Sequence, residues 1–306
     1  MRIAVMGTGG VGGYFGGRLA ANGEDVHFIA RGAHLAAMQQ RGLAIDSALG
    51  DAHVAPVQAT DDPGSIGPVD LVLFTVKLYD TEAAAEAIRP LIGPDTGVVT
   101  FQNGITGTAA LAEKLGAEHV LGGVARISAI IAEPGVIRHN GPIAELLFGE
   151  LDGRPTERVA ALATALETAD VEHKVSDDIG SAIWNKMVFL STFAGLTSLL
   201  RLPIGPIRTD PDTRALLRDG LAEALAVARA DGAALPENLV EQLLVFVDRL
   251  PEVMKSSMLH DLEAGRRLEV AWLSGTIAGL GQEHGLATPT HRLIASVLKL
   301  HADGRP

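Results

Sequence analysis

Cysteine is absent from all 306 residues of the sequence. Its absence excludes disulfide bonds, thiol catalysis and thiolate metal sites. The ten histidines are scattered, and Gly285 and Pro289 interrupt the C-terminal pair His284 and His291. We therefore expect no bound metal ion.

An excess of basic residues is also absent, because the formal net charge is −12. This charge argues against nucleic-acid and anionic-membrane partners, whereas a few local cations still suffice for a small anionic ligand. Long hydrophobic runs are missing too, since the longest, 187–200, is shorter than the ~20 residues that a bilayer span needs. The apolar run in the opening "MRIAVMG" is too short for a signal peptide, so we expect a cytoplasmic protein.

What the sequence does have is a change of pattern along its length. Its first part alternates apolar, strand-like runs such as 70–77 and 97–104 with helix-like segments. One of these helices, 81–90, has Thr81 as its expected N-cap and Pro90 as its stop. The alternation predicts a parallel sheet with helices on both faces.

From Ser181 onward the segments are long and helical. The predicted helices are 181–200, 212–231, 236–249, 252–264, 269–284 and 290–301. We therefore expect an α/β domain over residues 1–176 and an all-α domain over residues 177–306.

The stretch "GTGGVG" places Gly7, Gly9 and Gly12 in the GxGxxG spacing between the first strand and the first helix. Glycines in this context permit a tight turn and let the backbone approach a pyrophosphate, which the helix N-terminus attracts. The alternative is a plain glycine turn. We interpret residues 1–176 as a dinucleotide-binding domain of the Rossmann type.

Arg31 follows the second predicted strand. An NAD site carries an acid near this position for the ribose 2′-hydroxyl, whereas a guanidinium suits a 2′-phosphate. Arg31 therefore favours NADP(H), the alternative being an ordinary surface arginine.

Lys77 and Asn103 end two further predicted strands, 70–77 and 97–104. In an open parallel sheet such strand ends line the ligand crevice. Lys77 suits phosphate or ribose, and Asn103 suits a nicotinamide carboxamide or a substrate carbonyl. An ordinary solvated lysine and an Asn-Gly turn remain the alternatives.

Lys186 opens the apolar helix "NKMVFLSTFAGLTSLL", and no acid shares its helical face. Desolvation lowers the pKa of a lysine, which makes proton transfer near neutral pH easier. During hydride transfer to a carbonyl, an ammonium stabilises the developing oxyanion and then protonates it. The alternative is a lysine that reaches from the helix end to water.

The chain resembles the ketopantoate reductase (2-dehydropantoate 2-reductase) family over nearly its whole length. The resemblance is carried by "GTGGVGGYFGG", "FTVK", "QNG", "IWNKM", "SSMLHDLEAGRRLE" and "HGLATPT". It implies an N-terminal Rossmann domain, a helical C-terminal domain, NADPH-dependent reduction of a 2-keto acid and a role in pantothenate biosynthesis. A homodimer is left open.

By the same resemblance, Lys186 is the general acid, Glu269 engages the substrate and supports that lysine, and Ser257 contacts the substrate's polar end. Asn103 and Lys77 match residues that position cofactor and substrate. Read without the resemblance, Glu269 is an acid at a helix N-terminus, where the helix dipole favours it, and Ser257 is an inert helix residue.

Two positions depart from the family pattern. Where members acting on ketopantoate carry asparagines one and two turns after the lysine, this chain has Leu190 and Ala194. Three hypotheses follow: a 2-keto acid reductase, a reductase or dehydrogenase acting on a more apolar carbonyl compound, and a non-catalytic NADP(H) sensor. Lys186 and Glu269 together favour an enzyme.

Overall fold

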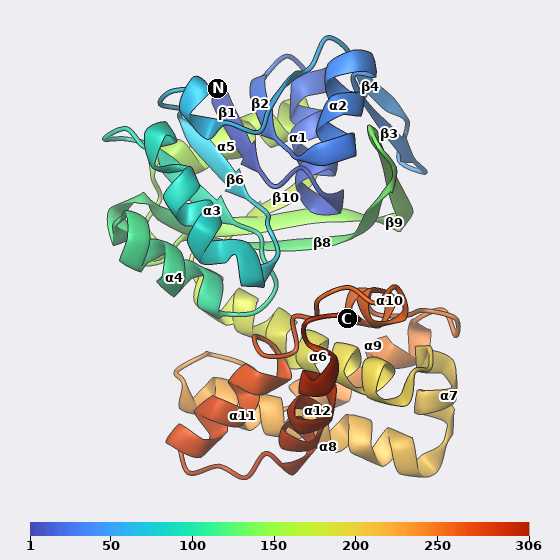
Figure 1. The fold of residues 1–306 in the computed structure, drawn as a ribbon. Coiled ribbons are helices and arrows are strands. Elements are labelled where there is room, and N and C mark those ends of the chain that lie inside the picture. Colours follow the sequence, from blue (N-terminus) through green and yellow to red (C-terminus); the bar gives the residue numbers. More distant parts are fainter. Residues whose placement is uncertain (306) are drawn as a thin grey trace. The chain divides into compact units, whose positions relative to one another are not determined.

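The computed structural model describes residues 1–305, and its ribbon is drawn in Figure 1. The chain forms two compact units, one of residues 1–102 and 106–182, the other of residues 103–105 and 183–306. The second unit thus includes a three-residue piece that follows a strand of the first. The division into a dinucleotide-binding domain up to residue 176 and a substrate domain after it remains a prediction.

The first unit is built on one sheet whose central strands are parallel. These strands are β1 (Arg2–Met6), β2 (Asp25–Ile29), β5 (Gln58–Thr60), β6 (Leu71–Phe74), β7 (Gly97–Thr100) and β8 (Val120–Glu133). Their order in the sheet is β5-β2-β1-β6-β7-β8. The chain moves to one side of β1 for β2 and to the other side for β6, so the carboxyl end of β1 is the topological switch point.

An extension continues the sheet beyond β8. Here β9 (Val136–Glu150) pairs antiparallel with β8, and β3 (Leu43–Ser47), β4 (Ala52–Val54) and β10 (Glu172–Val175) complete the sheet around it. The strand β9 is long, at 15 residues. Its full length depends on pairing with strands distant in sequence.

Helices cover both faces of this sheet, as expected. They are α1 (Gly10–Ala21), α2 (Gly32–Arg41), α3 (Thr81–Ala87), α4 (Thr106–Leu115) and α5 (Glu157–Thr168). Ile3 and Val5 of β1 pack in one apolar cluster with residues of α1, α2 and α5, whereas Ala4 and Met6 pack in another with residues of α3 and α4. This alternation along β1 is that of a strand buried on both sides.

The second unit is helical, and residues 183–305 contain no strand. Its helices are α6 (Ile179–Leu200, beginning in the first unit), α7 (Ile204–Thr209), α8 (Pro211–Ala230), α9 (Leu239–Arg249), α10 (Ser257–Glu263), α11 (Ser274–Glu283) and α12 (Pro289–Leu298). Residues 191–198 of α6 are all buried, so this part of the helix is covered on every side. Within residues 1–305, no helix is both long and apolar enough to cross a bilayer.

Candidate functional site

The glycine turn joins β1 to α1 at the topological switch point. Gly7 has a φ of +96°, and a Cβ at this position would lie 2.8 Å from Val76 Cγ1. A Cβ at Gly12 would lie 2.5 Å from the Gly7 carbonyl oxygen, closer than side chains approach such an atom. Gly7 is therefore required by the turn, and Gly12 by the close packing of α1 on the strand.

Gly9 differs from both, because a Cβ built on it would meet no atom within 4 Å. Gly9 is the N-cap of α1 and supplies no side-chain hydrogen bond to the helix. No side chain at Gly9 therefore occupies the space beside the N-terminus of α1. The positive end of a helix and open room beside it suit a pyrophosphate, so the residues present fit a dinucleotide.

Two threonines fasten this turn to the neighbouring strands. Thr8 Oγ1 donates a 3.0 Å hydrogen bond to the Ile29 carbonyl at the end of β2. Thr75 Oγ1 donates a 2.7 Å hydrogen bond to the Gly7 carbonyl from the loop after β6. The turn is thus held in place from both sides, by residues that the sequence analysis did not single out.

Arg31 lies where the sequence predicted, two residues after β2 and at the N-cap of α2. Its side chain is exposed, and no hydrogen bond or ion pair of its guanidinium is formed with the residues that the structure describes. The donors of Arg31 therefore remain available for a ligand at the same sheet edge as the glycine turn.

His34, one turn further along α2, also contacts the glycine turn. Its Nδ1 accepts a 3.0 Å hydrogen bond from the Gly135 amide, so the neutral ring carries its proton on Nε2. Burial lowers the pKa of His34, and the nearby Thr8 carbonyl opposes this only in part. His34 is therefore a structural residue that fastens α2 to the turn between β8 and β9.

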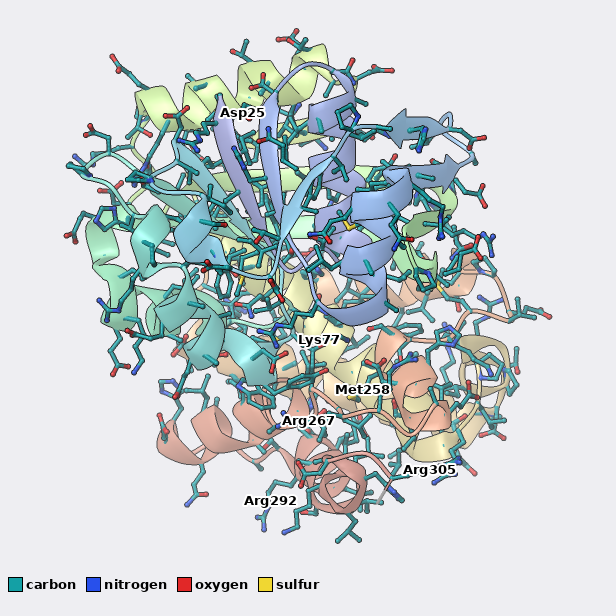
Figure 2. All side chains as sticks on the ribbon, turned by 45° about the horizontal axis from the view of Figure 1, so that its top comes forward. Asp25, Lys77, Met258, Arg267, Arg292 and Arg305 are labelled. Carbon is teal, nitrogen blue, oxygen red and sulfur yellow. The ribbon has the colours of Figure 1, made fainter. Side chains whose placement is uncertain are left out.

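Lys77 and Asn103 follow β6 and β7, both of which end at the sheet edge that carries the glycine turn. Figure 2 shows Lys77 at the opposite end of the first unit from Asp25, the first residue of β2, as parallel strands require. Lys77 and Asn103 are both half-buried. Asn103 is grouped with the second unit.

Gln102 joins the loops that carry these two residues, and the sequence analysis missed it. Its Nε2 donates to the Val76 carbonyl at 3.1 Å and to Thr81 Oγ1 at 2.8 Å. Thr81 Oγ1 in turn donates to the Leu78 carbonyl at 2.8 Å. The prediction that Thr81 is an N-cap is therefore wrong: Asp80 is the N-cap of α3, and the Thr81 hydroxyl serves this network.

Lys186 is half-buried in the second turn of α6. The helix begins where Asp178 accepts a 3.0 Å hydrogen bond from the Ser181 amide, a contact that lowers the pKa of Asp178. Trp184, two residues before the lysine, donates from Nε1 to Asp231 Oδ2 at 3.2 Å. The first two turns of α6, which carry Lys186, are therefore held by a hydrogen bond to Asp178 and by another from Trp184.

Glu269 is only 5% exposed and lies in the second unit, as Lys186 does. The prediction that it begins a helix is wrong. Its segment is a turn in which the Glu269 carbonyl accepts from the Trp272 and Leu273 amides, and α11 starts later, at Ser274. A buried carboxylate is costly unless cations or donors surround it, so this placement suits a carboxylate that works with a nearby ammonium.

Ser257 is the first residue of α10, and its side chain is exposed. The predicted helix 252–264 begins later than expected, because residues 252–254 instead bond to the start of α7: the Ile204 amide donates to the Met254 carbonyl, and the Gly205 amide to the Glu252 carbonyl. Figure 2 labels the next residue, Met258, on the short helix.

The predicted site residues therefore fall into two groups. Gly7, Gly9, Gly12, Arg31 and Lys77 gather at one edge of the sheet in the first unit. Lys186, Glu269 and Ser257 belong to three separate segments of the second unit. Among residues 1–305, no cluster of three or more His, Cys, Asp or Glu could hold a metal ion.

Family models and relatives match this chain along nearly all of its length. The model described as "Ketopantoate reductase PanE/ApbA" matches residues 3–153, and "Ketopantoate reductase PanE/ApbA C terminal" matches residues 178–302. The 2-dehydropantoate 2-reductase of Mesorhizobium japonicum is 33% identical, with 98% of this chain and 97% of the relative covered. "Uncharacterized oxidoreductase YkpB" of Bacillus subtilis is 31% identical, with coverages of 98% and 99%.

A solved structure is also similar to this chain. The crystal structure of 2-dehydropantoate 2-reductase from Geobacter metallireducens superposes with a TM-score of 0.92 at 36% identity, covering 98% of this chain and 99% of that one. The similarity therefore extends over both units in sequence and in fold.

Proposed function

The chain belongs to the ketopantoate reductase family, and we propose that it reduces a 2-keto acid to the 2-hydroxy acid with NADPH. The observation that carries this proposal is the glycine turn, where Gly9 leaves open space before the N-terminus of α1. Such a turn suits a dinucleotide pyrophosphate. The nicotinamide, when bound, supplies the hydride for the carbonyl carbon.

Arg31 supports NADPH over NADH. Its guanidinium is exposed at the carboxyl end of β2, the position where an NAD site has an acid. The planar fork of an arginine matches a phosphate, and a carboxylate there would repel one. Arg31 is therefore assigned to the 2′-phosphate, and Lys77 to the phosphates or ribose. Asn103 is assigned to the carboxamide or the substrate carbonyl.

Lys186 is assigned the proton transfer. As hydride adds to the carbonyl carbon, the oxygen becomes negative, and the Lys186 ammonium stabilises this charge and transfers a proton from Nζ to the oxygen. Glu269, buried in the same unit, is assigned to hold the ammonium and to engage the substrate. Ser257, exposed at the start of α10, is assigned to the polar end of the substrate.

A second candidate, reduction of a more apolar keto compound, is favoured by the α6 face that follows Lys186. Leu190 and Ala194 carry no hydrogen-bonding group, although ketopantoate has a hydroxyl that needs one. Thr197, further along this face, is fully buried, and its hydroxyl is already bonded to the Phe193 carbonyl at 2.7 Å. Ser191 is fully buried and lies on a different face of the helix. Neither Thr197 nor Ser191 is therefore placed to replace the missing amides.

A matched pair of substrates tests both candidates. Trimethylpyruvate is ketopantoate without its hydroxyl, and NADPH oxidation with each compound gives two kcat/KM values. We expect trimethylpyruvate to equal or exceed ketopantoate, because a buried hydroxyl without a partner costs about 1–3 kcal/mol. The double variant Leu190→Asn with Ala194→Asn should shift the ratio of the two values toward ketopantoate by about tenfold.

Leu199→Asn is the control for this shift, because Leu199 is a half-buried leucine on the opposite face of α6. It should leave the ratio unchanged. A wild-type kcat/KM on ketopantoate of about 10⁴ M⁻¹s⁻¹ or more, above that on trimethylpyruvate, would exclude the apolar candidate. Absence of NADPH oxidation with any 2-keto acid of graded size would exclude both.

A further inference from the structure

Ser256 and Thr197 form a buried pair of hydroxyls that joins two helices of the second unit. Their oxygens lie 2.8 Å apart, and the two residues are 2% and 0% exposed. Thr197 belongs to α6, the helix of Lys186, and Ser256 is the N-cap of α10. The pair therefore connects the helix of the proposed acid to the helix that begins with Ser257, as the neighbouring ribbons in Figure 1 illustrate.

The direction of these hydrogen bonds follows from counting hydrogens. The Leu259 amide donates to Ser256 Oγ at 3.0 Å, and Thr197 donates its one hydrogen to the Phe193 carbonyl at 2.7 Å. Ser256 must then donate to Thr197 Oγ1, which completes a chain from amide to hydroxyl to hydroxyl to carbonyl. Each hydroxyl in the chain both donates and accepts, so neither is left to bind a ligand, and the bonds strengthen one another.

This chain of hydrogen bonds matters because α10 is short. A helix of seven residues does not hold its own conformation or position in water. Its buried residues Met258, Leu259 and Leu262 supply apolar contacts, which are not directional. The hydroxyl pair adds a directional contact to α6 immediately before Ser257.

We propose that Thr197 and Ser256 are positioning residues, which fix Ser257 relative to α6 for binding of the 2-keto acid. This inference rests on the proposed function. Because the pair acts through Ser257 rather than on the reacting atoms, its loss should weaken substrate binding more than it slows the chemical step.

The test compares three variants of α6. Thr197→Val keeps the shape of the side chain, removes its hydroxyl and leaves the Ser256 cap intact. We expect the KM for the best keto acid to rise about tenfold, with kcat within about twofold of wild type and the dissociation constant of NADPH unchanged. Thr197→Ser retains the hydroxyl and should restore KM.

Ser198→Ala is the matched control, because Ser198 is also fully buried on α6, and its hydroxyl has no hydrogen-bond partner within residues 1–305. It should leave KM unchanged. An unchanged KM in Thr197→Val, or an equal rise in Ser198→Ala, would overturn the proposal. If Thr197→Val does not fold, Ser256→Gly replaces it, because glycine is tolerated at an N-cap and also removes the donor.

Hydrogen exchange gives a reading that needs no substrate. Amides of residues 257–263 should exchange faster in Thr197→Val than in wild type, whereas Ser198→Ala should match wild type. If the amides of residues 257–263 exchange at the same rate in Thr197→Val as in wild type, the hydroxyl pair does not hold α10 to α6, even if the enzyme is active. Failure of the wild type to reduce any keto acid, with faster exchange in the variant, would instead refute the proposed function.

Discussion

The two units carry their predicted site residues in different ways. In the first unit the predicted dinucleotide site is mainly backbone: the glycine turn, the N-terminus of α1 and the strand ends that surround them. In the second unit the predicted residues are side chains from segments far apart in sequence, namely Lys186, Glu269 and Ser257. A backbone site depends on the space beside each glycine, whereas a side-chain site depends on which distant segments meet.

The largest expected effect, and the one that best separates the roles proposed for the two units, is that of Lys186→Ala on kcat. This variant should lower kcat by about 10²–10⁴-fold, the usual contribution of a general acid, because it removes an interaction made in the transition state. NADPH should still bind with nearly wild-type affinity, because the glycine turn and Arg31 belong to the first unit. Steady-state kinetics and fluorescence titration measure the two effects.

Lys299→Ala, which removes an exposed lysine of the second unit, is the control and should behave as wild type. Glu269→Gln should also impair turnover, since it removes the charge assigned to hold the ammonium. If Lys186→Ala keeps most of the wild-type kcat, the proton comes from another group.

Arg31→Asp should instead weaken cofactor binding, which Lys186→Ala leaves nearly unchanged. Replacing a phosphate ligand with a repelling charge should weaken NADPH binding about 100-fold, while NADH binding changes much less. Titration of both cofactors against the wild type and the variant measures this. Equal affinity of the wild-type protein for NADPH and NADH would show that Arg31 does not select the cofactor.

Two glycine variants distinguish an effect on stability from an effect on cofactor binding within the first unit. Gly12→Ala should lower the free energy of unfolding by about 1–3 kcal/mol, because its Cβ would overlap Thr75 and the Gly7 carbonyl. Gly9→Ala should cost less stability than Gly12→Ala, since alanine is only a poorer N-cap than glycine, and it should weaken NADPH binding, because its Cβ projects into open space. Urea unfolding and cofactor titration separate the two results, with Gly279→Ala as a control at another open position. Full NADPH affinity in Gly9→Ala would place the pyrophosphate elsewhere.

The smallest expected effect is a pH dependence of stability from His291. This residue of α12 is fully buried, its Nε2 donates to the Gly220 carbonyl at 3.0 Å, and burial lowers its pKa. Below the ordinary histidine pKa of about 6.5, the unfolded chain takes up a proton that the folded chain refuses. The stabilisation is therefore complete above about pH 6.5 and decreases on acidification, by at most about 1.4 kcal/mol per pH unit.

Urea unfolding at neutral and mildly acidic pH checks this. His291→Gln should flatten the dependence relative to wild type, whereas the exposed His260→Gln should not. Parallel slopes for the wild type and His291→Gln would assign the acid sensitivity to other groups.

The parts of the fold that sequence predicted well are those set by local pattern. Apolar periodicity and nearby helix breakers were enough to predict the glycine turn, the strands 70–77 and 97–104, and the helices α6, α8 and α9. The α/β plus all-α architecture is confirmed. The family resemblance is confirmed by the matches over both units. Local signals of this kind need no knowledge of what packs against them.

The errors occur where distant hydrogen bonds override local preference. Residues 269–273 have a helical pattern, yet the preceding Leu268 amide bonds to the Ala302 carbonyl near the C-terminus, and the chain turns before α11 starts. Gln102 could not be singled out, because its role depends on Val76 and Thr81 being brought to it by the sheet. The site roles of Lys186, Glu269 and Ser257 came from resemblance and remain predictions.

The central claim, hydride transfer from NADPH to a 2-keto acid, is tested most directly by an isotope. NADPH deuterated at both C4 positions of the nicotinamide is mixed with the best keto acid of the series, and the product is examined by mass spectrometry. The account predicts a 2-hydroxy acid with one deuterium at C2 from the wild type, formed far more slowly by Lys186→Ala. No labelled hydroxy acid from any compound of the series, in the presence of bound NADPH, would contradict it.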